Sequence, residues 1–157
     1  MNSIYLRPVV VAAAALLFVS ACSTPRNRFP VQGYVPISRS MQPLGELHLS
    51  NSLMQLGALE GTMQLQYAGQ MTDEAGDDLA GASVYRVKNW SAFFKQNAGH
   101  TGFCTEAPRW VVVNSETGAP AWSSEITVGL LTLEDWKKFR PIAFTACVSG
   151  AYVRTKD

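Results

Sequence analysis

Two cysteines and a histidine in the second half of the chain offer its most reactive side chains. His100 stands four residues before Cys104 in the stretch GHTGFC, and a cysteine beside a histidine can act as a nucleophile with its base. Cys147 offers the alternative, because a pair of cysteines normally forms a disulfide when a protein is exported, and the N-terminal residues described below have the features of an export signal. That bond would remove the Cys104 thiolate, so the sequence predicts a Cys104–Cys147 disulfide and no catalysis at Cys104.

Clustered carboxylates form a second group of candidates. Asp73, Glu74, Asp77 and Asp78 crowd one short glycine-containing segment, and carboxylates grouped in this way can hold a calcium ion. Their spacing matches no known calcium loop. We therefore expect a solvated turn between two strands and no metal.

Glutamates in the C-terminal half are candidates for a glycan-cleaving enzyme, which needs two carboxylates across a cleft. They are Glu106, Glu116, Glu125 and Glu134, and the sequence pairs none of them. The chain also lacks HExxH, GxSxG and CxxC motifs. We therefore expect no enzyme and no cofactor, with a carboxylate enzyme acting on peptidoglycan kept as the alternative.

Three residues are candidates for contacts with a partner protein. Trp122 ends the turn-forming stretch SETGAPAW, and tryptophan is a common anchor of protein interfaces. Asp77 and Asp78 lie in the acidic segment, which we expect to be exposed. The interpretation of Trp122 as a residue folded back over the sheet edge stays open beside the binding one.

The N-terminal segment has the features of an export signal. Residues 1–7 carry one positive charge, and an apolar run of eleven residues follows from Val9 to Val19. A membrane-spanning helix needs about 20 apolar residues, so this run is too short to stay in a bilayer. The small residues Ser20 and Ala21 after the run are typical of a signal-peptidase site.

The next residue extends this pattern to a known class. Val19-Ser20-Ala21-Cys22 resembles the lipobox of bacterial lipoproteins, in which the cysteine carries the lipid and the signal is cut before it. The resemblance covers residues 1–22 and implies that Cys22 anchors the chain to a membrane. The residue after the cysteine is Ser23 and not aspartate, which in that family implies the outer membrane.

The composition limits the possible partners. The chain has 13 Lys and Arg against 12 Asp and Glu, and such a balance argues against nucleic acid. We expect a signal peptide over residues 1–21, a lipidated cysteine and proline-rich linker over 22–43, and one β-rich periplasmic domain over 44–157.

Alternating apolar residues predict several strands in this domain. They fall at 45–50, 61–69, 83–87 and 125–131, and a last strand is expected at 144–155 with a bulge at Gly150. Residues 109–115 contain a β-branched run that is too apolar for a strand exposed on one side. Residues 89–99 have helical spacing with Asn89 as cap, and a second helix is expected to begin at Thr132. The predicted fold is α+β or mostly β, a single small domain on an antiparallel sheet with two short helices and one disulfide.

The functional expectation is an outer-membrane lipoprotein that faces the periplasm and acts without catalysis. Its β-rich domain would bind an envelope protein or the cell wall, as an inhibitor, an immunity protein or an accessory subunit. A ligand-binding or structural lipoprotein is a further alternative, for which a large apolar pocket would be the characteristic feature.

Overall fold

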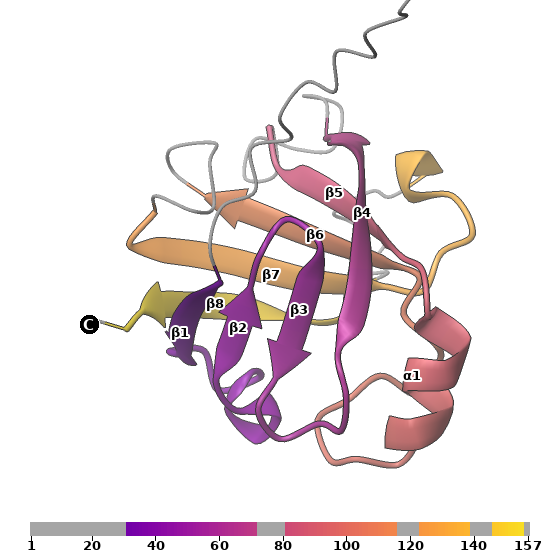
Figure 1. Cartoon of the computed structure of the whole chain (residues 1–157), viewed down its shortest axis with the longest axis horizontal. Coiled ribbons are helices and arrows are strands. Elements are labelled where there is room, and N and C mark those ends of the chain that lie inside the picture. The colour runs from indigo at the N-terminus through magenta and orange to yellow at the C-terminus, as the bar shows by residue number, and fades with distance from the viewer. Residues whose placement is uncertain (1–30, 72–80, 116–122, 139–145, 156–157) are drawn as a thin grey trace, which may run out of the picture.

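Eight antiparallel strands close into a barrel in the computed structural model, which describes residues 31–71, 81–115, 123–138 and 146–155. Each strand pairs with the next one along the chain, and the last pairs with the first (Figure 1). The strands are β1 (Gln32–Pro36), β2 (Leu47–Leu49), β3 (Leu53–Leu56), β4 (Met63–Gln70), β5 (Ser83–Val87), β6 (Trp110–Ser115), β7 (Glu125–Leu131) and β8 (Ala146–Arg154). The described part also contains the helix α1 (Trp90–Asn97) and the 3-10 turns η1 (Gln42–Leu44) and η5 (Trp136–Lys138). The predicted antiparallel, mostly β domain is confirmed, and its sheet is closed.

Alternation of side chains decides which residues enter the barrel. Along β4, Met63 and Leu65 are buried while Gln64 and Gln66 are exposed. Strands β2, β3 and most of β7 alternate in the same way, whereas Val111, Val112 and Val113 of β6 are all buried. All of the strands predicted from the sequence are present. Beyond them, β3 is a short strand that the sequence did not reveal.

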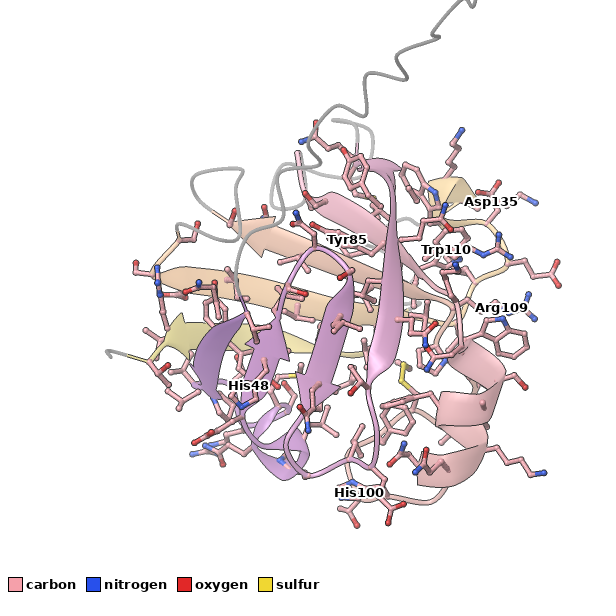
Figure 2. The ribbon with its side chains drawn as sticks, in the orientation of Figure 1. His48, Tyr85, His100, Arg109, Trp110 and Asp135 are labelled. Atoms are coloured by element: carbon pink, nitrogen blue, oxygen red, sulfur yellow. A yellow bond between two sulfur atoms is a disulfide. The ribbon has the colours of Figure 1, made fainter. Side chains whose placement is uncertain are left out.

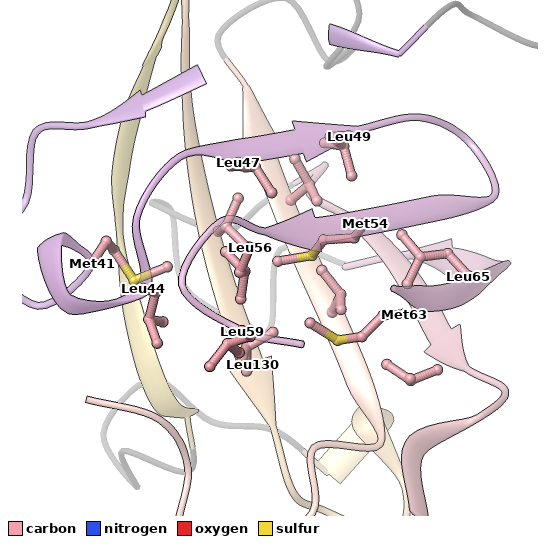
Figure 3. Close-up of a cluster of buried hydrophobic side chains, with 14 of the residues drawn as sticks. Met41, Leu44, Leu47, Leu49, Met54, Leu56, Leu59, Met63, Leu65 and Leu130 are labelled. Carbon is pink, nitrogen blue, oxygen red and sulfur yellow. The ribbon is translucent and has the colours of Figure 1, made fainter. Parts of the chain in front are cut away.

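Apolar side chains fill the interior of the barrel. The central group leaves at most 5% of each side chain exposed, and Figure 3 shows part of it. Its members include Leu47, Leu49, Met54, Leu56, Met63, Leu65, Val87, Val111, Val113, Ile126, Val128 and Leu130. An eight-stranded barrel is just wide enough for side chains to fill, so these residues form a packed core and not a channel.

Helix α1 helps to close the lower end of the barrel in Figure 1. Phe93 of the helix packs edge-on against Phe103, with ring centroids 6.0 Å apart, and both belong to the core. The buried Asn97 side chain accepts a hydrogen bond from the Glu60 N–H at 2.8 Å and donates one to the Glu60 carbonyl at 3.0 Å. Asn89 caps the helix by position, but its side chain binds β4 through the Gln64 N–H. These bonds fix the helix to the strand hairpin beside it.

A second apolar cluster lies on the outer face of β5 and β6. Val84 and Val112 are buried there beneath the segment that follows β7, where Trp136 packs on the cluster. The sequence predicted a helix from Thr132, and this prediction is wrong, because only the turn η5 forms in the described part. The Trp110 indole N–H donates to the Leu133 carbonyl at 2.9 Å, so tertiary contacts hold this segment against the barrel.

Gly150 of β8 lets the turn before η1 pass close to the strand. A bulge was predicted at this glycine, and that prediction is wrong. It pairs regularly with Val128, whereas the register shift lies at Cys147, between Val148 and Ala146. A Cβ atom at Gly150 would lie 2.5 Å from Met41 Cγ and 2.7 Å from Ser38 Cβ. The glycine therefore makes room for the turn that leads into η1.

The domain begins earlier than the sequence indicated. Strand β1 and the first two residues of η1 lie inside residues 22–43, which the proline content assigned to a linker. Strand β1 pairs with β2 on one side and with β8 on the other, so it closes the barrel. Residues 32–43 therefore belong to the folded domain.

Candidate functional site

The predicted disulfide between Cys104 and Cys147 is present. Their Cα atoms are 5.2 Å apart, and Cys104 is 4% exposed. The bond joins the segment that precedes β6 to strand β8. Strands β6 and β8 are the two neighbours of β7 in the barrel. His100 is engaged elsewhere, since its Nδ1 lies 2.9 Å from the Thr101 carbonyl oxygen. A cysteine bonded in this way offers no thiolate for nucleophilic attack.

The candidate carboxylates of the described segments face solvent. Glu106, Glu125 and Glu134 are all exposed, and Glu134 lies 3.7 Å from the guanidinium of Arg109. In the same segments, no three His, Cys, Asp or Glu side chains are grouped to hold a metal ion.

Several predicted site residues fall in segments that the structure leaves undescribed. They are Cys22, Asp73, Glu74, Asp77, Asp78, Glu116 and Trp122. Their roles in lipid attachment, metal binding or partner contact therefore stay predictions. No helix in the described ranges is long and apolar enough to cross a membrane.

Three tyrosines belong to the buried core, namely Tyr34, Tyr85 and Tyr152. Burial raises the pKa of Tyr85, and a hydrogen bond with the Ser83 side chain opposes part of that rise in pKa. Burial also raises the pKa of Tyr152 to about 12, and its hydroxyl lies 3.4 Å from the Gly45 carbonyl. Both side chains are therefore neutral at physiological pH and serve the packing of the core.

A group of polar and aromatic side chains gathers on the outer wall around β5. Arg86 lies between Gln66 of β4 and Trp110 of β6 in one row of paired residues. Lys88 follows two residues later, and its N–H donates to the Gln64 carbonyl at 2.8 Å. We call Gln64, Gln66, Arg86, Lys88 and Trp110 the β5 patch. Figure 2 shows Trp110 on one side of the barrel and His48 on the other.

The β5 patch is electropositive. Arg86 and Lys88 are exposed, and no carboxylate of the described residues lies within 4 Å of either one. Next to the patch, the guanidinium carbon of Arg109 lies 4.9 Å from the centre of the Trp90 ring. Unlike Arg86 and Lys88, Arg109 has a carboxylate partner among the described residues, which is Glu134.

The sequence showed only part of this patch. The alternation in SVYRV and the lysine after it predicts that Arg86 and Lys88 lie on the face opposite to Tyr85 and Val87. The structure agrees, because both cations are exposed while Tyr85 and Val87 are buried. Their neighbours come from β4 and β6, so the register of three strands was needed to bring the group together. Two cations at positions i and i+2, one in the predicted strand and one directly after it, were the signal available in the sequence.

Comparison with protein-family models, with curated protein sequences and with solved structures finds no match to this chain.

Proposed function

We propose that this protein is a lipid-anchored envelope protein whose barrel binds another protein without catalysis. The observation that supports this proposal is the packed interior, whose central side chains are at most 5% exposed. A barrel filled by its own side chains leaves its outer wall as the surface for recognition. The β5 patch, with an arginine, a tryptophan and two glutamines, has the composition of a contact surface.

Anchoring belongs to the same proposal and rests on the lipobox resemblance. The lipid would be on Cys22, in the outer membrane, with the barrel in the periplasm. Residues 23–31 separate Cys22 from β1, which begins at Gln32. Nine extended residues span at most about 30 Å, so the barrel would stay close to the membrane. Two or three acyl chains would give the stable attachment that one chain does not.

The test is affinity capture with the full chain carrying a C-terminal tag, expressed in a bacterium that processes lipoproteins. The control is a fusion of residues 1–31 to an unrelated monomeric domain, which retains the anchor and loses the barrel. We expect the mature chain to begin at Cys22 with the mass of its acyl groups. We also expect a stoichiometric protein partner on the full chain and not on the fusion.

Two results would contradict the proposal. Equal capture by the chain and the control fusion would show that the barrel adds no partner. A small molecule retained by the barrel in native mass spectrometry, without a protein partner, would favour a ligand-binding lipoprotein. A bait without residues 32–43 would be uninformative about function, because it lacks β1 and the barrel would stay open.

A further inference from the structure

We propose that the β5 patch binds a carboxylate-bearing surface of the partner protein, with Arg86 as the central contact. This inference rests on the proposed function, since it names the chemistry of the partner. The acidic residues and Trp122 singled out in the sequence play no part in it.

The charges of the patch favour an anionic partner. Arg86 lies in β5, and Lys88 directly follows the last residue of that strand, two positions further along the chain. Two residues of extended backbone set their Cα atoms about 7 Å from each other. Both side chains are exposed, and neither is neutralised by a carboxylate of the described residues. A surface with two acidic side chains at a similar spacing would neutralise both cations at once.

The neighbours of Arg86 favour a carboxylate as the group that it binds. A guanidinium and a carboxylate are both planar and form two parallel hydrogen bonds. Gln66 flanks Arg86 on one side and adds an amide that can donate a further bond. Trp110 flanks it on the other side, and its indole N–H is held by the Leu133 carbonyl at 2.9 Å. The indole is thus fixed before a partner arrives, which lowers the entropic cost of binding.

The position of the patch argues against a membrane as the occupant. Lys88 and Trp110 lie where β5 ends and β6 begins, which is the end of the barrel that carries α1. The chain enters β1 at the opposite end (Figure 1). A barrel tethered through its N-terminal residues would direct that opposite end toward the bilayer. The patch would then face away from the lipid headgroups and toward other envelope proteins.

The test uses the purified full chain and a labelled hexaglutamate peptide, with binding followed by fluorescence anisotropy at low ionic strength. The main variant is R86E/K88E. Its matched control is R39E/K95E, which changes the charge equally at two exposed residues outside the patch. Hexaglutamine, hyaluronate and phosphatidylglycerol vesicles serve as alternative ligands. Thermal unfolding checks that each variant is folded, and R86Q/K88Q replaces the main variant if charge reversal prevents folding.

We expect R86E/K88E to weaken hexaglutamate binding at least tenfold and the control pair to change it less than threefold. Arg86→Lys keeps the charge but loses the planar group, and we expect it to weaken binding about threefold or more. Equal weakening by both pairs would show a general charge effect and overturn the proposal. Preferential binding of hyaluronate or vesicles through Arg86 and Lys88 would overturn it as well, because the occupant would not be a protein. Neither outcome would affect the capture experiment, which tests whether any protein binds the barrel.

Discussion

Replacing Gly150 by alanine tests whether the turn before η1 needs a residue without a Cβ atom at this position of β8. The new Cβ would lie 2.5 Å from Met41 Cγ, 2.7 Å from Ser38 Cβ and 2.8 Å from Ser40 Oγ. Carbon atoms in contact are normally about 3.5–4.0 Å apart, so the turn would have to move by about 1 Å. It is held in place, because Ser40 Oγ donates to the Ser149 carbonyl at 2.7 Å and Ser38 Oγ accepts the Ala151 N–H at 2.8 Å.

The expected loss in the free energy of unfolding for Gly150→Ala is about 3 kcal/mol. Overpacking contributes about 1–3 kcal/mol, and a weakened hydrogen bond adds about 1 kcal/mol. The matched control is Gly129→Ala on β7, where the new Cβ would lie 3.7 Å from Ser149 Cβ in ordinary contact. Equilibrium unfolding in guanidinium chloride, followed by fluorescence of the four tryptophans, measures both variants. A loss below about 0.5 kcal/mol for Gly150→Ala, or equal losses for the two variants, would refute the reasoning.

Three further changes test other parts of the fold by the same unfolding assay. Replacing Cys104 and Cys147 by alanine removes a bond between residues 43 positions apart and should cost about 4 kcal/mol by the loop-entropy estimate; a loss under 1 kcal/mol would contradict it. Asn97→Ala leaves the Glu60 N–H and carbonyl without their partner and should cost about 2–4 kcal/mol, whereas an unchanged midpoint would show that the helix is held by packing alone. The pKa of Tyr152 rises from 10.0 to about 12 in the folded state, so its neutral form stabilises the fold below pH 10 and this contribution is lost as the pH rises to 12. Between pH 10 and pH 12 the wild type should lose about 2 kcal/mol more than Tyr152→Phe, and parallel curves for the two proteins would contradict this.

Short-range patterns predicted most of the strands, because alternation is a property of neighbouring residues. The strand around Met63 and the helix around Phe93 were visible in this way, and the cysteine count predicted the disulfide. β6 was recognised as buried on both faces because Val111, Val112 and Val113 follow one another. The structure gives the reason, since Val112 lies in the outer cluster and its two neighbours lie in the core.

Long-range pairing accounts for what the sequence did not show. In β1, Tyr34 is the buried residue of a strand that also contains glycine and proline, so its pattern is typical of a linker. Its place in the barrel comes from pairing with β8, where Tyr34 faces Arg154. The β5 patch was hidden for the same reason, because Gln66, Arg86 and Trp110 meet through strand register alone.

The most direct test of the central claim is photo-crosslinking in living cells. A photoreactive amino acid replaces Gln66 in the patch, or His48, which is exposed on β2 on the other side of the barrel (Figure 2). If the outer wall at β5 binds an envelope protein, the chain labelled at position 66 forms a discrete protein adduct, R86E/K88E reduces this adduct, and the chain labelled at position 48 forms none. The absence of an adduct from position 66, or the same adducts from both positions, would contradict the account.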